Sequence, residues 1–114
     1  MAEPTLTERL SHMLEAIEHI IARTADVDQH AFADDRFTQL GVERCLEIIS
    51  EASRHIPDHL KSAHPSIPWR RIADIGNRIR HAYHAVDSEI VWLITKDDLP
   101  DLKATLLLMM SSKC

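Results

Sequence analysis

The residues best suited to chemistry lie in one window, 69–92, with the sequence WRRIADIGNRIRHAYHAVDSEIVW. This window holds four of the 13 basic residues, two histidines and the only tyrosine of the chain. On a helix, Asn77, Arg78 and His81 share one surface, because side chains three or four positions apart are neighbours. Arg80 points further round the helix. The window therefore predicts a polar face centred on His81.

Such a face suits metal-independent cleavage of RNA. An imidazole titrates near neutral pH, so His81 can act as general base or general acid at a ribose 2′-hydroxyl. A guanidinium from Arg78 or Arg80 can hold the phosphate and stabilise charge during attack by the 2′-oxygen, which leaves a cyclic phosphate. Asn77 can donate to a phosphate oxygen or fix the imidazole tautomer. The sequence shows no ring of carboxylates suited to two-metal hydrolysis, so neither a metal nor a cofactor is expected.

The first half of the chain predicts two long helices joined by a loop. Apolar residues recur at three- and four-residue steps over 6–23, which predicts an amphipathic helix capped by Thr5 or Thr7. The stretch 24–34 is polar and without period, so we expect a connection there. A second helix is expected from near Asp35 to the proline at position 57. Its expected apolar positions are Phe37, Leu40, Cys45, Ile48, Ile49 and Ala52.

Prolines and apolar stripes divide the second half of the chain. Residues 57–63 can add a short helical turn that begins with proline, and two further prolines make 64–68 a rigid elbow. A long helix is expected from Trp69, and it either ends near Tyr83 or continues. The apolar positions of this helix are Ile72, Ile75, Ile79 and Ala82. Those of the next segment are Val86, Ile90, Val91 and Ile94, and those of the last helix are Leu99, Leu102, Leu106 and Met109. Short breaks between such segments predict an all-α antiparallel bundle of about five to six helices.

Length and composition exclude several classes of protein. A chain of 114 residues is expected to form a single domain over 1–114. A net charge of −5 argues against a globally basic nucleic-acid binder, although a local basic patch fits. No apolar run approaches the roughly 18 residues of a membrane span, and the first ten residues are polar, so neither a membrane segment nor a signal peptide is expected. Cys45 and Cys114 are typical of reduced thiols in a cytoplasmic protein.

Some residues of the chain also have structural explanations. Gly76 inside a helix costs about 1 kcal/mol relative to alanine, which predicts close approach of another backbone or a ligand, at a dimer seam or within one subunit. His55 and His59 are four residues apart, but the proline between them breaks the helix that would align them on a metal. Cys45 lies on an apolar helix face without an adjacent histidine, so we expect a packed thiol.

The chain resembles the HEPN superfamily, in particular the HepT-like ribonuclease toxins that pair with a minimal nucleotidyltransferase antitoxin. The resemblance covers nearly the whole chain and is carried by the segments LSHMLEAIEHI, GVERCLEIISEAS, HPSIPWRRIADIGN, RHAYHAVDSEIVW and DDLPDL. The family signature is Arg, four residues, His, one residue, Tyr. His81 and Tyr83 match its second and third members, and Asn77 matches the asparagine that often follows the arginine. Gly76 stands at the position of the arginine itself.

The resemblance implies a metal-independent RNA endonuclease that acts as the toxin of a toxin–antitoxin system. Its catalytic residues here would be His81 and Asn77 with Arg78 or Arg80. The resemblance also implies a homodimer in which the two motif helices line a shared cleft. A nucleotidyltransferase-type antitoxin is the implied partner, and it would silence the toxin by transferring AMP onto Tyr83.

Two alternatives remain open at the level of the sequence. Because Gly76 replaces the signature arginine, the chain can instead be a catalytically inactive HEPN module that binds RNA or nucleotide, or that scaffolds a nucleotidyltransferase partner. A structural helical dimer with an unrelated role is the third possibility. It gains weight if Arg78 and Arg80 both point away from His81.

Overall fold

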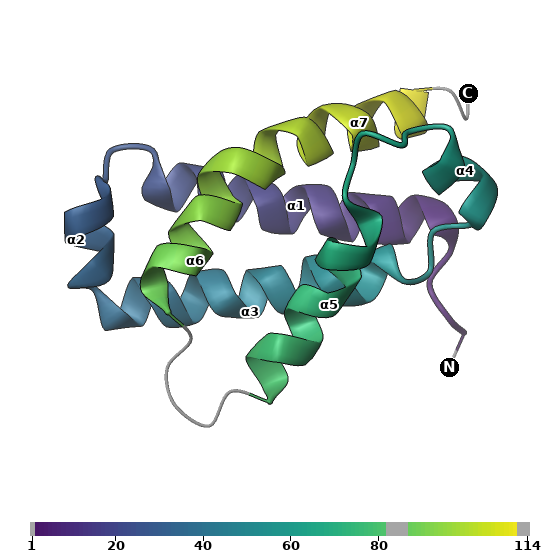
Figure 1. Ribbon diagram of the computed structural model, residues 1–114. Coiled ribbons are helices and arrows are strands. Elements are labelled where there is room, and N and C mark those ends of the chain that lie inside the picture. The colour runs from purple at the N-terminus through teal and green to yellow at the C-terminus, as the bar shows by residue number, and fades with distance from the viewer. Residues whose placement is uncertain (1, 82–86, 112–114) are drawn as a thin grey trace.

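The computed structural model describes residues 2–81 and 87–111, which form a bundle of helices (Figure 1). The elements are α1 (Leu6–Thr24), α2 (Gln29–Ala33), α3 (Arg36–Ser53), α4 (Asp58–Ser62), α5 (Trp69–Arg80), α6 (Ser88–Leu93), the π-helical turn η1 (Ile94–Asp98) and α7 (Leu99–Ser111). The described ranges contain no strand, so the predicted all-α class is confirmed.

The start of α1 is fixed by a capping box. The hydroxyl of Thr5 accepts a hydrogen bond from the Glu8 N–H at 3.1 Å, and the Glu8 carboxylate accepts one from the Thr5 N–H at 2.8 Å. These two bonds satisfy N–H groups that have no partner within the helix. Thr5, rather than Thr7, is therefore the N-cap.

The segment expected to be a plain connection contains a short helix, α2. Asp28 caps it by accepting a hydrogen bond from the Ala31 N–H at 2.8 Å. Phe32 is buried, and its ring packs on Trp92 of α6 with the ring centroids 5.3 Å apart. The prediction over 24–34 was wrong because a five-residue helix held by one buried aromatic side chain shows no helical period.

The helix α3 starts where the sequence indicates, but its apolar face is partly different. Asp35 is the N-cap, and its carboxylate accepts hydrogen bonds from the N–H and the hydroxyl of Thr38 at 3.1 and 2.6 Å. Phe37 is 83% exposed and Leu40 is 47% exposed, so these two apolar positions of the expected helix do not belong to its buried face. Both lie on a side of α3 that the described helices leave open. The buried apolar residues of the helix are Val42, Leu46, Ile49 and Ala52.

The proline-rich elbow is tied to the start of α5. Pro57 is the N-cap of α4 rather than its first residue, so this helix begins one residue later than expected. The indole N–H of Trp69 donates to the carbonyl oxygens of Lys61 and His64, both at 3.1 Å. These bonds connect the end of α4 and the elbow to the first residue of α5, and so fix the direction in which α5 leaves.

The last three elements follow one another without a break. Asp87 caps α6 by accepting a hydrogen bond from the Glu89 N–H at 2.9 Å. The π-helical turn η1 then joins α6 to α7, where the sequence indicated two separate helices. The four apolar positions expected to be buried in α7, Leu99, Leu102, Leu106 and Met109, are all buried. No described helix combines the length and the apolar character that crossing a bilayer requires.

The helices pack around one apolar core. In Figure 1, α1 and α3 lie side by side, α7 runs along α1, and α5 crosses α3. The core draws residues from α1, α3, α5 and α7, and the bundle measures 42 × 28 × 27 Å. Its completely inaccessible residues are Leu10, Met13, Ile17, Leu102 and Leu106.

Candidate functional site

The C-terminal half of α5 carries the polar face centred on His81. Asn77, Arg78 and His81 are exposed, whereas Ile72 and Ile75 of the same stretch are buried against the core. His81 is the C-cap residue, and its backbone N–H donates to the Asn77 carbonyl at 3.1 Å. The imidazole therefore stands at an accessible helix end, where an external substrate can reach it.

The side chain of Arg80 runs back along α5 toward the preceding turn. Its Nη2 donates to Oδ1 of Asn77 at 3.4 Å. Its Nη1 lies 3.4 Å from the point that a β-carbon on Gly76 would occupy. Arg80 thus covers Gly76 and orients the amide of Asn77, so that the NH₂ group of that amide remains available as a donor.

Gly76 lies buried where α5 crosses α3, and a serine of α3 explains it. The hydroxyl of Ser50 accepts a hydrogen bond from the Gly76 N–H at 2.9 Å and donates to the Ala73 carbonyl at 2.8 Å. Arg54 donates to the same carbonyl at 2.8 Å. A β-carbon on Gly76 would lie 2.8 Å from Oγ and 3.0 Å from Cβ of Ser50. Of the two explanations that the sequence left open, close packing within one subunit accounts for this glycine.

Arg78 lies on a different side of α5 from Arg80. Residues two positions apart are separated by about 200° around a helix. Arg78 borders a small apolar hollow of about 50 Å³ between α5 and α6, together with Ile79 and Ile90. Next to this hollow, Arg71 forms an ion pair with Asp98 at 2.6 Å, which ties α5 to η1. Of the two candidate arginines, Arg80 is the one that contacts Asn77.

Tyr83 falls outside the described residues, as do the remaining positions of 82–86. Of the other residues expected at the site, Asn77, Arg78, Arg80 and His81 all lie on the last turn of α5, where Arg80 contacts Asn77 and Arg78 lies on a different side of the helix. Sequence analysis missed Ser50, which is separated from Gly76 by 26 positions along the chain. The only signal for such a partner was a glycine inside a helix, and that signal does not say which residue approaches it.

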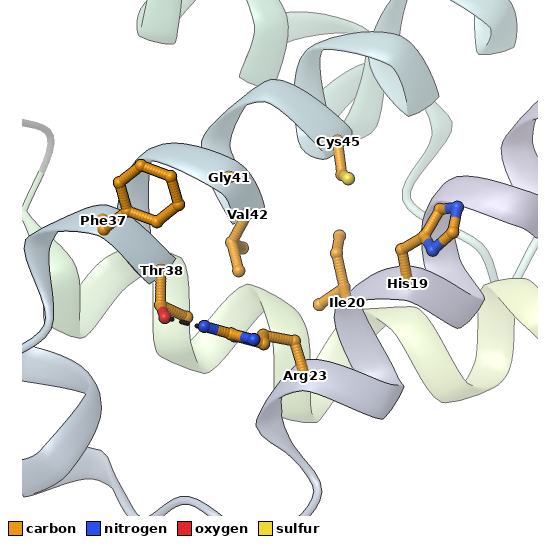
Figure 2. Close-up of a pocket in the computed structure, with 8 residues that line it drawn as sticks. All are labelled: His19, Ile20, Arg23, Phe37, Thr38, Gly41, Val42 and Cys45. Atoms are coloured by element: carbon orange, nitrogen blue, oxygen red, sulfur yellow. Dashed lines mark hydrogen bonds between the residues drawn. The ribbon is translucent and has the colours of Figure 1, made fainter.

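A second, separate surface lies between α1 and α3. It is a groove of about 310 Å³, and Figure 2 shows Arg23 reaching across it to donate from Nε to the Thr38 hydroxyl at 3.4 Å. Gly41, on its wall, and Ser50 are nine residues apart on α3, which puts them about 180° apart around that helix. The groove therefore opens on the side of α3 that faces away from α5. Its lining residues are His19, Ile20, Arg23, Phe37, Thr38, Gly41, Val42 and Cys45.

The surroundings of Cys45 and His55, which both lie outside the motif, are structural. Burial raises the pKa of the Cys45 thiol, and the charge of Arg44 offsets only part of that rise. This thiol is therefore protonated at neutral pH, as befits a packing residue. His55 lies 3.3 Å from the Glu51 carboxylate. Within the described ranges, no three side chains of the metal-binding types converge on one point.

Comparison with known proteins identifies the relatives of the chain. The model of the family Ribonuclease HepT-like matches residues 13–109. A probable ribonuclease HepT of Thermococcus cleftensis is 44% identical over 94 residues, which cover 82% of this chain and 86% of that protein. A putative RNase of Methanocaldococcus jannaschii is 34% identical over the same shares of both chains. A putative RNase of Caldanaerobacter subterraneus is 30% identical over 82% of this chain and 84% of its own length. No solved structure gives a significant match.

Proposed function

The chain belongs to the Ribonuclease HepT-like family, and we propose that it is a metal-independent RNA endonuclease acting at the exposed end of α5. The observation that carries this proposal is the grouping of His81 and Asn77 with the Arg80 guanidinium at one accessible helix terminus. The names of the relatives, which are ribonucleases or putative RNases, support RNA as the substrate. The chain would act in the cytoplasm as one domain over 1–114.

In the proposed reaction, His81 removes the proton from a ribose 2′-hydroxyl. The 2′-oxygen then bonds to the adjacent phosphorus, and the bond from phosphorus to the 5′-oxygen breaks. The leaving 5′-oxygen takes up a proton from water, and the upstream fragment keeps a 2′,3′-cyclic phosphate. A guanidinium neutralises the phosphate as charge builds on its oxygens, and the amide NH₂ of Asn77 donates to one of them. No step requires a metal ion.

The reaction is tested with a defined RNA oligonucleotide in EDTA, with product ends identified by mass spectrometry. Wild-type protein is expected to produce 2′,3′-cyclic phosphate ends. His81→Ala is expected to lose about 10²- to 10⁴-fold in kcat, the usual share of general acid–base catalysis. His59→Ala, which changes a histidine far from the motif in sequence, is the matched control. Equal cleavage by wild type and His81→Ala, or no cleavage by wild type, would contradict the catalytic proposal.

We extend the proposal to the biological role of a toxin paired with a nucleotidyltransferase-type antitoxin. The antitoxin would transfer AMP from ATP to the hydroxyl of Tyr83, with release of pyrophosphate. The added phosphate would stand two residues from His81 and repel the RNA backbone. Expression of the chain alone is expected to arrest growth, and His81→Ala is expected to relieve the arrest. Growth arrest that persists in His81→Ala would argue against toxicity through RNA cleavage.

A homodimer with a shared cleft is supported by apolar side chains beside the motif. On α6, Ile90 is 42% exposed and Leu93 is 47% exposed. They lie near the half-buried Ile79 and Ile94. Ile90 borders the hollow next to Arg78, and both Ile90 and Leu93 border a second hollow next to Arg71. Exposed apolar patches of this kind mark association surfaces, and a two-fold axis here would bring both motif helices to one cleft.

The dimer is tested by sedimentation equilibrium at micromolar concentration. Wild type is expected to be dimeric, and the double variant Ile90→Glu, Leu93→Glu is expected to be monomeric. Leu108→Glu provides the control, because this side chain is 60% exposed on α7. A monomeric wild type, or a double variant that stays dimeric, would rule out this interface.

The replacement of the signature arginine by Gly76 favours a second candidate function. An inactive module would bind RNA or nucleotide, or hold the nucleotidyltransferase, without cutting RNA. It predicts retention of a labelled oligonucleotide without new product ends, and normal growth on expression alone.

A further inference from the structure

The arrangement around Gly76 bears on which arginine binds the phosphate. Arg80 follows Gly76 by four residues, so both lie on one face of α5. The Arg80 guanidinium returns over Gly76, with Nη1 3.4 Å from the site of the missing β-carbon and Nη2 3.4 Å from Oδ1 of Asn77. It therefore occupies the space into which a side chain at position 76 would project.

We infer that Arg80 takes the place of the signature arginine, and that Gly76 and Ser50 are the positioning residues that make this possible. The inference rests on the RNA-binding role proposed above. Arg80 forms no ion pair with any carboxylate of the described residues, whereas Arg71 is held by Asp98. The charge of Arg80 is thus available to a phosphate, and Asn77 stands beside it as a second donor.

Ser50 sets how close α5 comes to α3. Its side chain is 1% exposed, and its buried hydroxyl is satisfied on both sides by α5, through the Gly76 N–H and the Ala73 carbonyl. A buried hydroxyl without such partners is costly, so these two bonds fix the rotation of α5 about its axis. That rotation decides where the side chains of Arg80 and His81 emerge.

The same contact excludes a side chain at position 76. A β-carbon there would approach the Ser50 oxygen to 2.8 Å, closer than side chains pack, and would come into ordinary contact with Nη1 of Arg80 at 3.4 Å. An arginine at 76 would therefore displace Ser50, and it would compete with the guanidinium of Arg80 for the space beside it. In this chain the guanidinium belongs instead to Arg80, four residues later and about 6 Å further along the helix axis. Its long side chain extends back toward position 76.

The first test uses a binding measurement, so that it does not depend on cleavage. A fluorescein-labelled RNA oligonucleotide with 2′-O-methyl groups cannot react through a 2′-oxygen, and its affinity is read by fluorescence anisotropy over a range of salt concentrations. Arg80→Ala is expected to weaken binding about tenfold and to lower the salt slope by about one phosphate contact. Arg78→Ala, the matched control, is expected to change affinity less than threefold. An equal or larger effect of Arg78→Ala would overturn the inference.

The second test examines the positioning role of Ser50. Gly76→Ala is expected to reproduce the tenfold loss of affinity for the same oligonucleotide. Ser50→Gly alone is expected to weaken binding as well, because α5 loses the two hydrogen bonds that fix its rotation. Because Ser50→Gly removes both serine atoms that the new β-carbon would meet, adding Gly76→Ala to it is expected to change affinity less than threefold further. Circular dichroism confirms that each variant is folded. Unchanged binding by Gly76→Ala or by Ser50→Gly, or a further tenfold loss in the folded double variant, would show that Ser50 does not position Arg80.

The two proposals fail in different ways. If wild type binds the oligonucleotide through Arg80 but never cuts unmodified RNA, the nuclease proposal falls and the assignment of Arg80 stands. If wild type cuts RNA through His81 and Arg80→Ala cuts and binds as well as wild type, only the assignment of Arg80 falls.

Discussion

Two glycines in helix interiors show how differently the same residue type can be used. Gly76 lies against Ser50, and a β-carbon there would meet the serine at 2.8 Å. At Gly41, by contrast, a β-carbon would have no described atom within 4 Å. Neither glycine has a positive φ. The packing of α3 and α5 therefore requires glycine at position 76, and nothing in the described fold requires it at position 41.

This difference predicts opposite effects of the same substitution. Gly41→Ala is expected to increase the free energy of unfolding by about 0.5–1 kcal/mol, because alanine has the higher helix propensity and the site has room. Gly76→Ala is expected to decrease it, because the new β-carbon displaces Ser50. Urea unfolding followed by circular dichroism measures both values. A stabilised Gly76→Ala would mean that α3 and α5 are not held as closely as their hydrogen bonds indicate.

Cys45 provides a prediction about reactivity. Because burial raises the pKa of its thiol, the thiolate fraction at neutral pH is smaller than in an exposed cysteine. In a Cys114→Ser background, alkylation by iodoacetamide at pH 7.5 is expected to be slower for the native protein than for the same protein in urea. The native rate should still be rising with pH above the ordinary thiol pKa. Equal native and unfolded rates at pH 7.5 would show that the thiol is neither shielded nor shifted.

Among the helices, the periodic spacing of apolar residues located the long ones, but it did not show which side of each helix another helix covers. The starts of α1 and α3 follow from Thr5 and Asp35, whose side chains accept the free N–H groups of the first turn. The exposure of Phe37 was not predictable, because the period marks an apolar stripe and says nothing about which helix covers it. The short helix α2 was missed because its stability comes from tertiary packing of one aromatic ring.

The cap of α3 predicts a pH dependence. Hydrogen bonds from the Thr38 hydroxyl and N–H hold the pKa of Asp35 below its ordinary value of 3.8. A carboxylate with a lowered folded-state pKa stabilises the fold above its unfolded pKa, and this stabilisation is lost as the pH falls through the folded value. Asp35→Ala is therefore expected to lower Tm at pH 7, and the difference from wild type should shrink as the pH falls below about 3.8.

Asp35→Asn separates the charge from the cap. The asparagine oxygen can still accept from the Thr38 N–H, and its cap does not titrate. Its Tm at pH 7 is expected to lie between those of wild type and Asp35→Ala. A wild-type advantage over Asp35→Ala that persists unchanged down to pH 2 would contradict the lowered pKa.

Across the whole molecule, the spacing of residues along the chain predicted more of the fold than of the candidate site. Asn77 and His81 could be placed on one face of a helix because they are four residues apart. The choice between Arg78 and Arg80 could not be made, since it depends on how α5 packs against α3. The role of Ser50 could not be predicted either, because it also depends on the contact between α3 and α5. Contacts between distant segments decide which of several suitable side chains is aimed at one point.

A pair of truncations tests whether the open side of α3 is as exposed in solution as it is in the single chain. Leu102 is inaccessible in the core, so Leu102→Ala is expected to reduce the free energy of unfolding by about 2–5 kcal/mol. Phe37→Ala removes more atoms than Leu102→Ala, but Phe37 is 83% exposed. Its truncation is therefore expected to change the free energy of unfolding by less than about 0.5 kcal/mol. Urea unfolding at two protein concentrations measures both. A loss of several kcal/mol for Phe37→Ala would contradict the free exposure of this ring. If that loss also depended on protein concentration, a second chain would be identified as the partner that covers the ring, because only association varies with concentration.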